Sequence, residues 1–144
     1  MTVASIAEVL GGQHTLKARV VSTTKLRALT RQGLPAEIVA SLAQDLGLPR
    51  ARVAEVLGIP ERTLSRRIAS GSRLTAEESD RAVRFARVLA AAKETLGSLE
   101  KAGRWLQMPN RALENEAPFD LLDTDAGVQS VETVLGRIAY GVYS

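Results

Sequence analysis

The sequence predicts an all-α protein, because its composition and its recurring helix signals both favour helices. Of 144 residues, 45% are hydrophobic but only 3% are aromatic, so the core has to be aliphatic and rich in alanine. Alanine is the strongest helix former, whereas strands are enriched in β-branched and aromatic residues. Apolar residues recur at helical spacings, and glycine or proline separates one such stretch from the next. The length suits one compact domain or two small lobes.

The composition also argues against several classes of protein. The chain has no cysteine, hence no disulfide framework and no thiolate metal site. No apolar run approaches the roughly 18 residues of a membrane-spanning helix, and the N-terminus lacks the pattern of a signal peptide. The single histidine, His14, has no candidate ligand beside it, and no glycine-rich phosphate loop is present. We therefore expect a soluble cytoplasmic protein with no catalytic residue, metal, cofactor or membrane partner.

Charge is unevenly distributed along the chain, whose net charge is +3. Residues 1–49 hold five basic and three acidic residues, residues 50–87 hold nine and five, and residues 88–144 hold five and eight. The corresponding net charges are +2, +4 and −3. A basic middle suits a polyanion and an acidic last third does not, so the two parts are expected to have different partners.

Residues 1–23 give the weakest pattern. Ser5 as N-cap with Glu8 three residues later predicts a capping box and a short helix, which Gly11-Gly12 stops. The alternation from Leu16 to Val21 indicates a possible short strand. An arm used in self-association and a loose tail both remain open for this segment.

Residues 24–73 predict a four-helix lobe. One helix spans Thr24 to Gln32 and ends at Gly33, and Pro35 opens a second helix that Gly47 closes. The second helix has an apolar stripe of Ile38, Val39, Leu42 and Leu46.

The stretch from Arg50 to Ala69 supplies the other two helices, joined by Gly58-Ile59-Pro60. The first has Val53, Val56 and Leu57 on one face, and Ala54 is small enough to let the second helix cross close by. Gly58 suits a turn that needs positive φ, and Leu64 and Ile68 anchor the second helix inward. The outward residues of the second helix are Glu61, Arg62, Thr63, Ser65, Arg66 and Arg67.

This outward face is typical of a helix-turn-helix recognition helix, whose arginines and hydroxyls grip phosphates and read bases. The alternative is an ordinary helical hairpin with a solvated charged face. The coincidence of the small residue, the glycine, the turn length and three arginines favours the helix-turn-helix. Arg62, Arg66 and Arg67 are expected to carry DNA binding by at least a dimer, on half-sites about 34 Å apart.

Residues 74–144 predict further helices. Thr75 to Glu78 forms a capping box for the longest helix, which reaches about Leu96, and its Arg81, Arg84 and Arg87 form either a solvated face or phosphate contacts. The buried stripe of that helix is predicted to be Ala82, Phe85, Ala86, Leu89, Ala92 and Leu96.

Three shorter elements follow. Ser98 caps a helix that contains Trp105 and stops at Pro109, Pro118 begins a short turn, and Thr124 caps the last helix. The chain then ends on Val142-Tyr143-Ser144, an unusually apolar and aromatic end, which either packs on its own domain or enters a partner.

From about Leu34 to Ser144 the chain resembles the Xre-type antitoxins of RES–Xre toxin–antitoxin pairs, the Xre/MbcA/ParS group. Four pieces carry the resemblance: LGIPERTLSRRIASGSRLTAEESDR, AGRWLQMPNRAL, PFDLLD, and the final helix with its Gly-Val-Tyr-Ser end. The resemblance implies a type II antitoxin that inhibits a RES-domain, NAD-degrading toxin by covering its active site, and represses the shared promoter. Its implied partners are that toxin, operator DNA and a second copy of the chain.

The resemblance also implies residue roles and domains. Recognition-helix positions are Arg62, Thr63, Ser65, Arg66 and Arg67, supported structurally by Ala54, Gly58 and Leu64. Toxin-binding positions are Trp105, Pro109, Asn110 and Leu113, followed by a tail toward the toxin's active site, Tyr140, Gly141, Val142, Tyr143 and Ser144. The expected organisation is a helix-turn-helix domain (24–73) and a toxin-binding domain with an inhibitory tail (74–144). Residues 1–23 gain nothing from the resemblance and are expected to form an N-terminal arm of uncertain structure.

One stretch departs from the family pattern. Glu114-Asn115 and Ala117 stand where the family often has Gly-Gly and a hydroxyl residue. Asn115 tolerates positive φ, so the turn is expected to form, whereas Ala117 loses a cap of about 1 kcal/mol. The competing function is a plain helix-turn-helix regulator whose C-terminal domain only dimerises or senses a ligand.

Overall fold

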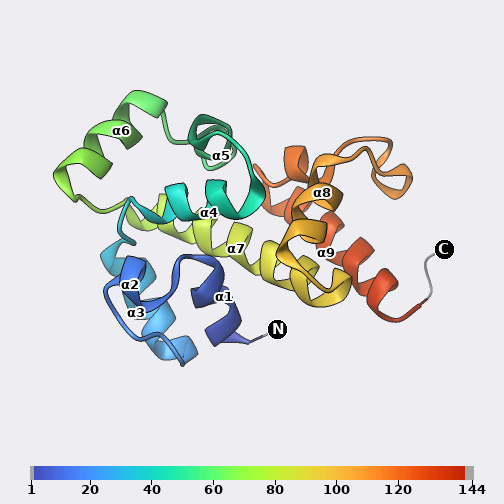
Figure 1. Cartoon of the computed structure of the whole chain (residues 1–144), viewed down its shortest axis with the longest axis horizontal. Coiled ribbons are helices and arrows are strands. Elements are labelled where there is room, and N and C mark those ends of the chain that lie inside the picture. Colours follow the sequence, from blue (N-terminus) through green and yellow to red (C-terminus); the bar gives the residue numbers. More distant parts are fainter. Residues whose placement is uncertain (1, 142–144) are drawn as a thin grey trace.

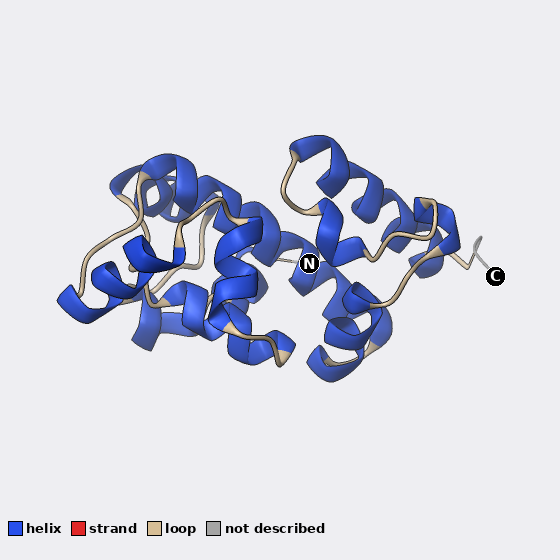
Figure 2. Ribbon diagram, turned by 90° about the horizontal axis from the view of Figure 1, so that it is seen from above, coloured by secondary structure: helices blue, strands red, loops and turns tan. Residues whose placement is uncertain are grey.

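The computed structural model describes residues 2–141, which form nine α-helices and two short 3₁₀ helices. These residues contain no strand, so the all-α prediction is confirmed (Figure 2). The elements are α1 (Val3–Val9), α2 (Gly12–Leu16), α3 (Thr23–Gln32), α4 (Ile38–Leu46), α5 (Arg50–Val56), α6 (Glu61–Ser70), α7 (Ala76–Leu96), α8 (Leu99–Gln107), η1 (Arg111–Leu113), η2 (Pro118–Leu121) and α9 (Asp125–Ala139).

The helix α7 is the central element, and in Figure 1 it crosses the middle of the molecule from one half to the other. The predicted capping box at its start is present, with the Thr75 hydroxyl accepting from the Glu78 N–H and the Glu78 carboxylate accepting from the Thr75 N–H. It contacts α1 and α3 from the N-terminal half and α8 and α9 from the C-terminal half. The predicted stripe is buried, except that Leu96 is only half-buried, and Val88 and Ala90 are buried in addition. The hydrophobic core is therefore continuous through both halves.

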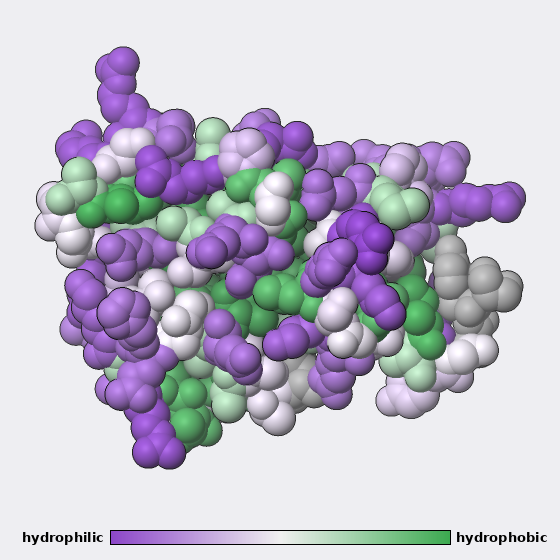
Figure 3. Space-filling view, in the orientation of Figure 1, coloured by the Kyte–Doolittle hydropathy of each residue, from purple (hydrophilic) through white to green (hydrophobic). Residues whose placement is uncertain are grey.

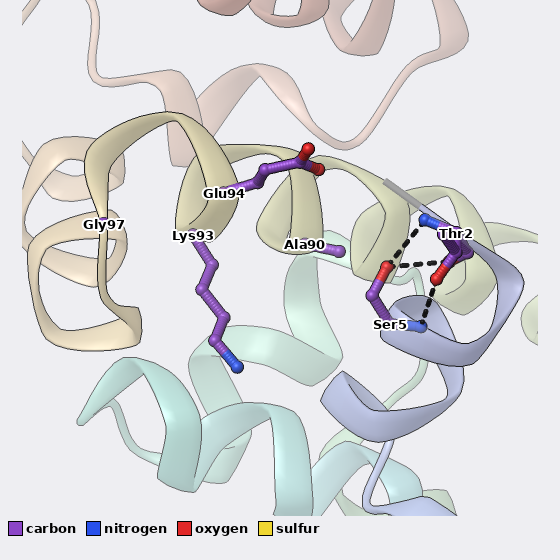
Figure 4. Close-up of a pocket in the computed structure, with 6 residues that line it drawn as sticks. All are labelled: Thr2, Ser5, Ala90, Lys93, Glu94 and Gly97. Atoms are coloured by element: carbon purple, nitrogen blue, oxygen red, sulfur yellow. Dashed lines mark hydrogen bonds between the residues drawn. The ribbon is translucent and has the colours of Figure 1, made fainter.

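The start of the chain differs from the prediction. Thr2, not Ser5, is the N-cap of α1, and the Thr2 hydroxyl accepts from the Ser5 N–H at 3.1 Å while the Ser5 hydroxyl accepts from the Thr2 N–H at 2.9 Å. Figure 4 shows this reciprocal pair beside Ala90 and Glu94 of α7. Starting the helix at Val3 makes it long enough to turn its apolar face onto α7.

The strand predicted from Leu16 to Val21 is wrong. Leu16 ends α2, and the next residue, Lys17, has a left-handed backbone with φ of 58°. A loose tail is also wrong, because Leu10 and Leu16 are fully buried and α1 and α2 contact α4. Apolar burial against α4 and α7 thus fixes this segment more strongly than its weak strand pattern.

In the next lobe, α3 ends at Gly33 and α4 closes at Gly47, both as predicted. The second helix begins at Ile38 rather than at Pro35, because residues 34–36 pair with residues 72–74 instead. The Leu74 N–H donates to the Leu34 carbonyl at 2.8 Å, and the Ala36 N–H donates to the Ser72 carbonyl at 3.0 Å. This pairing closes the N-terminal half beside the end of α6.

Close packing joins the two halves. Gly103 of α8 lies against Leu46 of α4, where a Cβ would sit 3.6 Å from the Leu46 Cα, and the Gln107 amide donates to the Leu46 carbonyl at 3.1 Å. Since α7 belongs to both halves, the domain boundary expected at residue 73 stays a prediction. Within residues 2–141, no helix combines the length and apolar character needed to cross a membrane.

Candidate functional site

The first candidate site is the α5–turn–α6 unit. Ala54, Leu57 and Leu64 are fully buried at the crossing of the two helices, and the Ile59 N–H donates to the Ala54 carbonyl at 2.9 Å. Gly58 has the positive φ expected of it, 72°, which a residue with a Cβ adopts only at a cost. These contacts fix the angle at which α6 leaves the turn.

Two arginines hold this unit on α7. The Arg67 guanidinium is paired with the Glu78 carboxylate, and the Arg81 Nε donates to the Leu57 carbonyl at 2.8 Å. Burial alone would raise the pKa of Glu78, but the Thr75 N–H and the Arg67 guanidinium outweigh it, so this pKa lies below its usual 4.5. The expectation that Arg67 faces outward differs from the structure, in which its side chain is only 20% exposed.

The outward face of α6 presents Arg62 and Arg66 to solvent, with Thr63 and Ser65 half-buried beside them. Figure 3 shows hydrophilic side chains over the edge of the molecule where α6 lies. Arg50, at the start of α5, donates to the Ser65 hydroxyl at 3.1 Å. Sequence reasoning missed this partner, although a basic residue opening the helix before the turn was a usable signal.

The arginines predicted as a solvated or phosphate-binding face of α7 are bound within the protein. Arg81 serves the Leu57 carbonyl, Arg84 pairs with Asp80 at 3.0 Å, and Arg87 makes two hydrogen bonds to Glu132 of α9 at 2.8 and 3.0 Å. The Glu132 carboxylate raises the pKa of Arg87 above its usual value. The partners of Arg81 and Arg87 lie 24 and 45 residues away, which local spacing could not show, whereas Arg84 pairs within its own helix.

The second candidate site is the loop after α8. Asn110 organises it: its side-chain oxygen accepts from the Ala112 N–H at 2.9 Å, and its carbonyl accepts from the Asn115 N–H at 2.9 Å. Leu113 is buried beneath the loop. The exposed side of the loop has a shallow pocket of about 220 Å³, lined by Trp105, Met108, Pro109, Asn110 and Arg111.

Apolar side chains reach solvent beside this pocket. Met108 is 61% exposed, and Trp105 is half-buried and packs against the core. The turn expected to survive without glycine does form, with Glu114 and Asn115 both left-handed at φ of 58° and 66°. Ala117 makes no side-chain cap for η2, as expected.

A groove of about 560 Å³ separates this loop from α9. Gly127 lines this groove, and there α9 approaches η2 so closely that an added Cβ would lie 1.8 Å from the Leu121 carbonyl oxygen. Groove residues include Leu113, Glu114, Glu116, Leu121, Thr124, Gly127, Ser130, Thr133 and Arg137.

We expect Gly127→Ala to destabilise the protein by about 3 kcal/mol, because overpacking forces α9 away from η2. Gly136→Ala is the matched control on the same helix. A Cβ at Gly136 meets nothing within 4 Å, so alanine there should add up to about 1 kcal/mol through helix propensity. Urea unfolding of the two variants checks this, and equal stabilities would contradict the close approach.

The end of the chain is only partly described. Tyr140 is 86% exposed, and Gly141, just after α9, has a left-handed backbone with φ of 69°. The predicted inhibitory residues Val142, Tyr143 and Ser144 lie outside the described residues.

In a comparison with known protein families, each half of the chain matches a different domain family. Residues 25–87 match the family described as the antitoxin Xre-like helix-turn-helix domain. Residues 91–141 match the antitoxin Xre/MbcA/ParS C-terminal toxin-binding domain.

Similar whole proteins carry the name antitoxin Xre. That of Yersinia enterocolitica serotype O:8 / biotype 1B is 35% identical over 139 residues, covering 84% of this chain and 94% of the relative. That of Photorhabdus laumondii is 34% identical over 120 residues, covering 83% and 81%. A chain in the crystal structure of the M. tuberculosis MbcT–MbcA toxin–antitoxin complex is 28% identical with a TM-score of 0.57, covering 76% of this chain and 96% of that one.

Proposed function

The chain belongs to the Xre/MbcA/ParS family of antitoxins, with a helix-turn-helix domain and a toxin-binding domain, and we propose that it inhibits a RES-domain toxin that degrades NAD and represses their shared promoter. The observation that carries this proposal is the presence of both matched domains in one chain, with opposite net charges over the regions concerned. Both activities take place in the cytoplasm.

Operator binding is assigned to the solvent side of α6. Arg62 and Arg66 contact phosphates or base edges, and the Thr63 and Ser65 hydroxyls add hydrogen bonds. Arg67 contributes by holding α6 against Glu78 on α7, so that the helix enters the groove as a rigid body. Two copies of the chain bind two half-sites, because one recognition helix contacts only a few base pairs.

Toxin binding is assigned to the acidic C-terminal part. Trp105, Met108 and Pro109 offer an exposed apolar patch beside the loop that Asn110 and Leu113 shape. Such a patch suits the centre of a protein interface, where aromatic side chains and methionine are enriched. From there α9 leads to the exposed Tyr140 and to the tail, which covers the toxin's active site.

Co-purification tests the proposal and separates it from a plain transcription regulator. The chain is expressed with the product of the neighbouring gene, expected to be a RES-domain toxin, and the complex and cellular NAD are measured. We expect a stable complex and preserved NAD, with NAD lost when the toxin is expressed alone. Failure of the two proteins to associate, with NAD lost in both cultures, would favour the plain regulator.

A further inference from the structure

The N-terminal end of α6 carries a three-residue network that the assignment of Arg62 and Arg66 does not use. Arg50 Nη2 lies 3.1 Å from the Ser65 Oγ and 3.5 Å from Glu61 Oε1, and the Ser65 Oγ donates to the same carboxylate oxygen at 3.3 Å. Glu61 and Ser65 lie on α6, the helix proposed to meet DNA, and Arg50 opens the preceding helix, α5. Arg50 and Glu61 are partly open to solvent, with 36% and 46% of their side chains exposed.

A carboxylate on this face requires an explanation, since it repels phosphates. An acidic residue in a first helical turn stabilises the helix dipole, which would be the structural role of Glu61. That role needs no donors that fix the direction of the carboxylate. In this structure the Arg50 guanidinium and the Ser65 hydroxyl both contact Glu61 Oε1. The contacts of the described residues do not involve Glu61 Oε2, so this oxygen can accept from another partner.

The position of Glu61 matches the part of a recognition helix that reads bases. In helix-turn-helix complexes the N-terminal residues of the second helix contact base edges in the major groove. An ionised carboxylate only accepts hydrogen bonds. Cytosine presents its N4 amino group as a donor there, whereas adenine pairs its amino group with the N7 acceptor, which repels a carboxylate.

Arg50 has donors to spare for a second task. Both of its contacts within the protein use Nη2, and a guanidinium carries five N–H groups. Arg50 opens α5, and the first helix of this motif crosses the DNA backbone. One side chain can therefore grip a phosphate and orient the neighbouring carboxylate.

We propose that Glu61 reads a cytosine in each operator half-site and that Arg50, anchored on the adjacent phosphate, is the residue that positions it. The inference rests on the proposed DNA binding through α6 and adds a specificity-determining residue to it. Ser65, proposed above to hydrogen-bond DNA, then acts instead on Glu61, as a second donor that fixes the carboxylate.

The test selects binding sites from a pool of randomised DNA duplexes with the full-length chain, and then measures the affinity for every single base-pair change. Wild type should require one C·G pair per half-site, preferring it by about tenfold or more. Glu61→Gln should lose that preference and shift toward adenine, since a glutamine amide pairs with adenine N6 and N7. Arg50→Met should weaken the same preference and lower the salt slope by about one phosphate contact.

Glu55→Gln is the matched control, because it removes the same charge from an exposed position on α5. It should leave every base preference unchanged. Unaltered preferences in Glu61→Gln, or the same shift in both variants, would overturn the inference while leaving DNA binding intact. A wild-type chain that selects no sequence would overturn the proposed operator binding and this inference together.

Discussion

Replacing Arg62 and Arg66 by alanine should lower operator affinity by about 100-fold at moderate salt. The two guanidinium groups are exposed on the outward face of α6. Loss of each contact should cost about 1–3 kcal/mol. Because about 1.4 kcal/mol corresponds to a tenfold change in affinity, two losses near the lower end of that range give about 100-fold. If both contact phosphates, the slope of log affinity against log salt should fall by about two. Fluorescence anisotropy with the promoter duplex across a salt series measures both quantities.

Arg27→Ala with Arg31→Ala is the control for this variant. Both residues are exposed on α3, so the same two charges are removed from the other edge of the N-terminal half (Figure 1). The control should bind the operator within about twofold of wild type. Equal losses in both double variants would mean that the net charge, and not the face of α6, drives binding.

Removing residues 142–144 should restore NAD loss while much of the complex with the RES-domain toxin still forms. The left-handed Gly141 ends the helical path, and Tyr140 beside it is exposed to a partner. Burial of Val142 and the Tyr143 ring would supply about 1.5–3 kcal/mol each before the cost of ordering the chain. A tyrosine ring with its hydroxyl also suits a pocket that holds a ring of NAD.

A variant with both Val142 and Tyr143 replaced by alanine keeps the length of the chain and removes only the side chains. It should inhibit as poorly as the truncation if side-chain burial closes the active site. NAD consumption is followed at a stoichiometric ratio of the two proteins, beside a pull-down of the complex. A truncated chain that still silences the toxin would show that inhibition depends on the rest of the domain.

Local signals in the sequence account for much of the fold. The capping box at Thr75, the serine cap at Ser98 and the glycines after α3, α4 and α6 each act through residues three or four positions away. Such signals fix helix ends wherever no competing signal lies nearby. For that reason the span of α7 and the order of the later elements were predictable.

The start of the chain shows where local signals fail. Thr2 and Ser5 both qualify as N-caps, and a capping box can be written for either residue. The choice depends on which register turns Ile6, Val9 and Leu10 onto the rest of the protein, and that surface is made by α4 and α7. Sequence periodicity contains no information about that distant surface.

For the candidate site, too, the sequence predicted local features but not contacts between residues distant in sequence. Residues facing out from α6 follow from helical spacing alone, but the partners of Arg67 and Arg87 lie 11 and 45 residues away. Whether an arginine is free for DNA depends on those partners. The link from Arg50 to Ser65 joins two helices across the turn, so the basic residue at the start of α5 indicated a role in the motif but did not identify its partner.

Toxin neutralisation by the Arg62→Ala/Arg66→Ala variant tests the central claim, that one chain carries two separable activities. The variant is expressed from a promoter that it does not control, together with the RES-domain toxin, and cellular NAD is measured. Neutralisation equal to wild type is the predicted result, because the α6 face lies outside the matched toxin-binding domain. Loss of NAD despite a folded and abundant variant would contradict the claim, since the face of α6 would then be needed for inhibition.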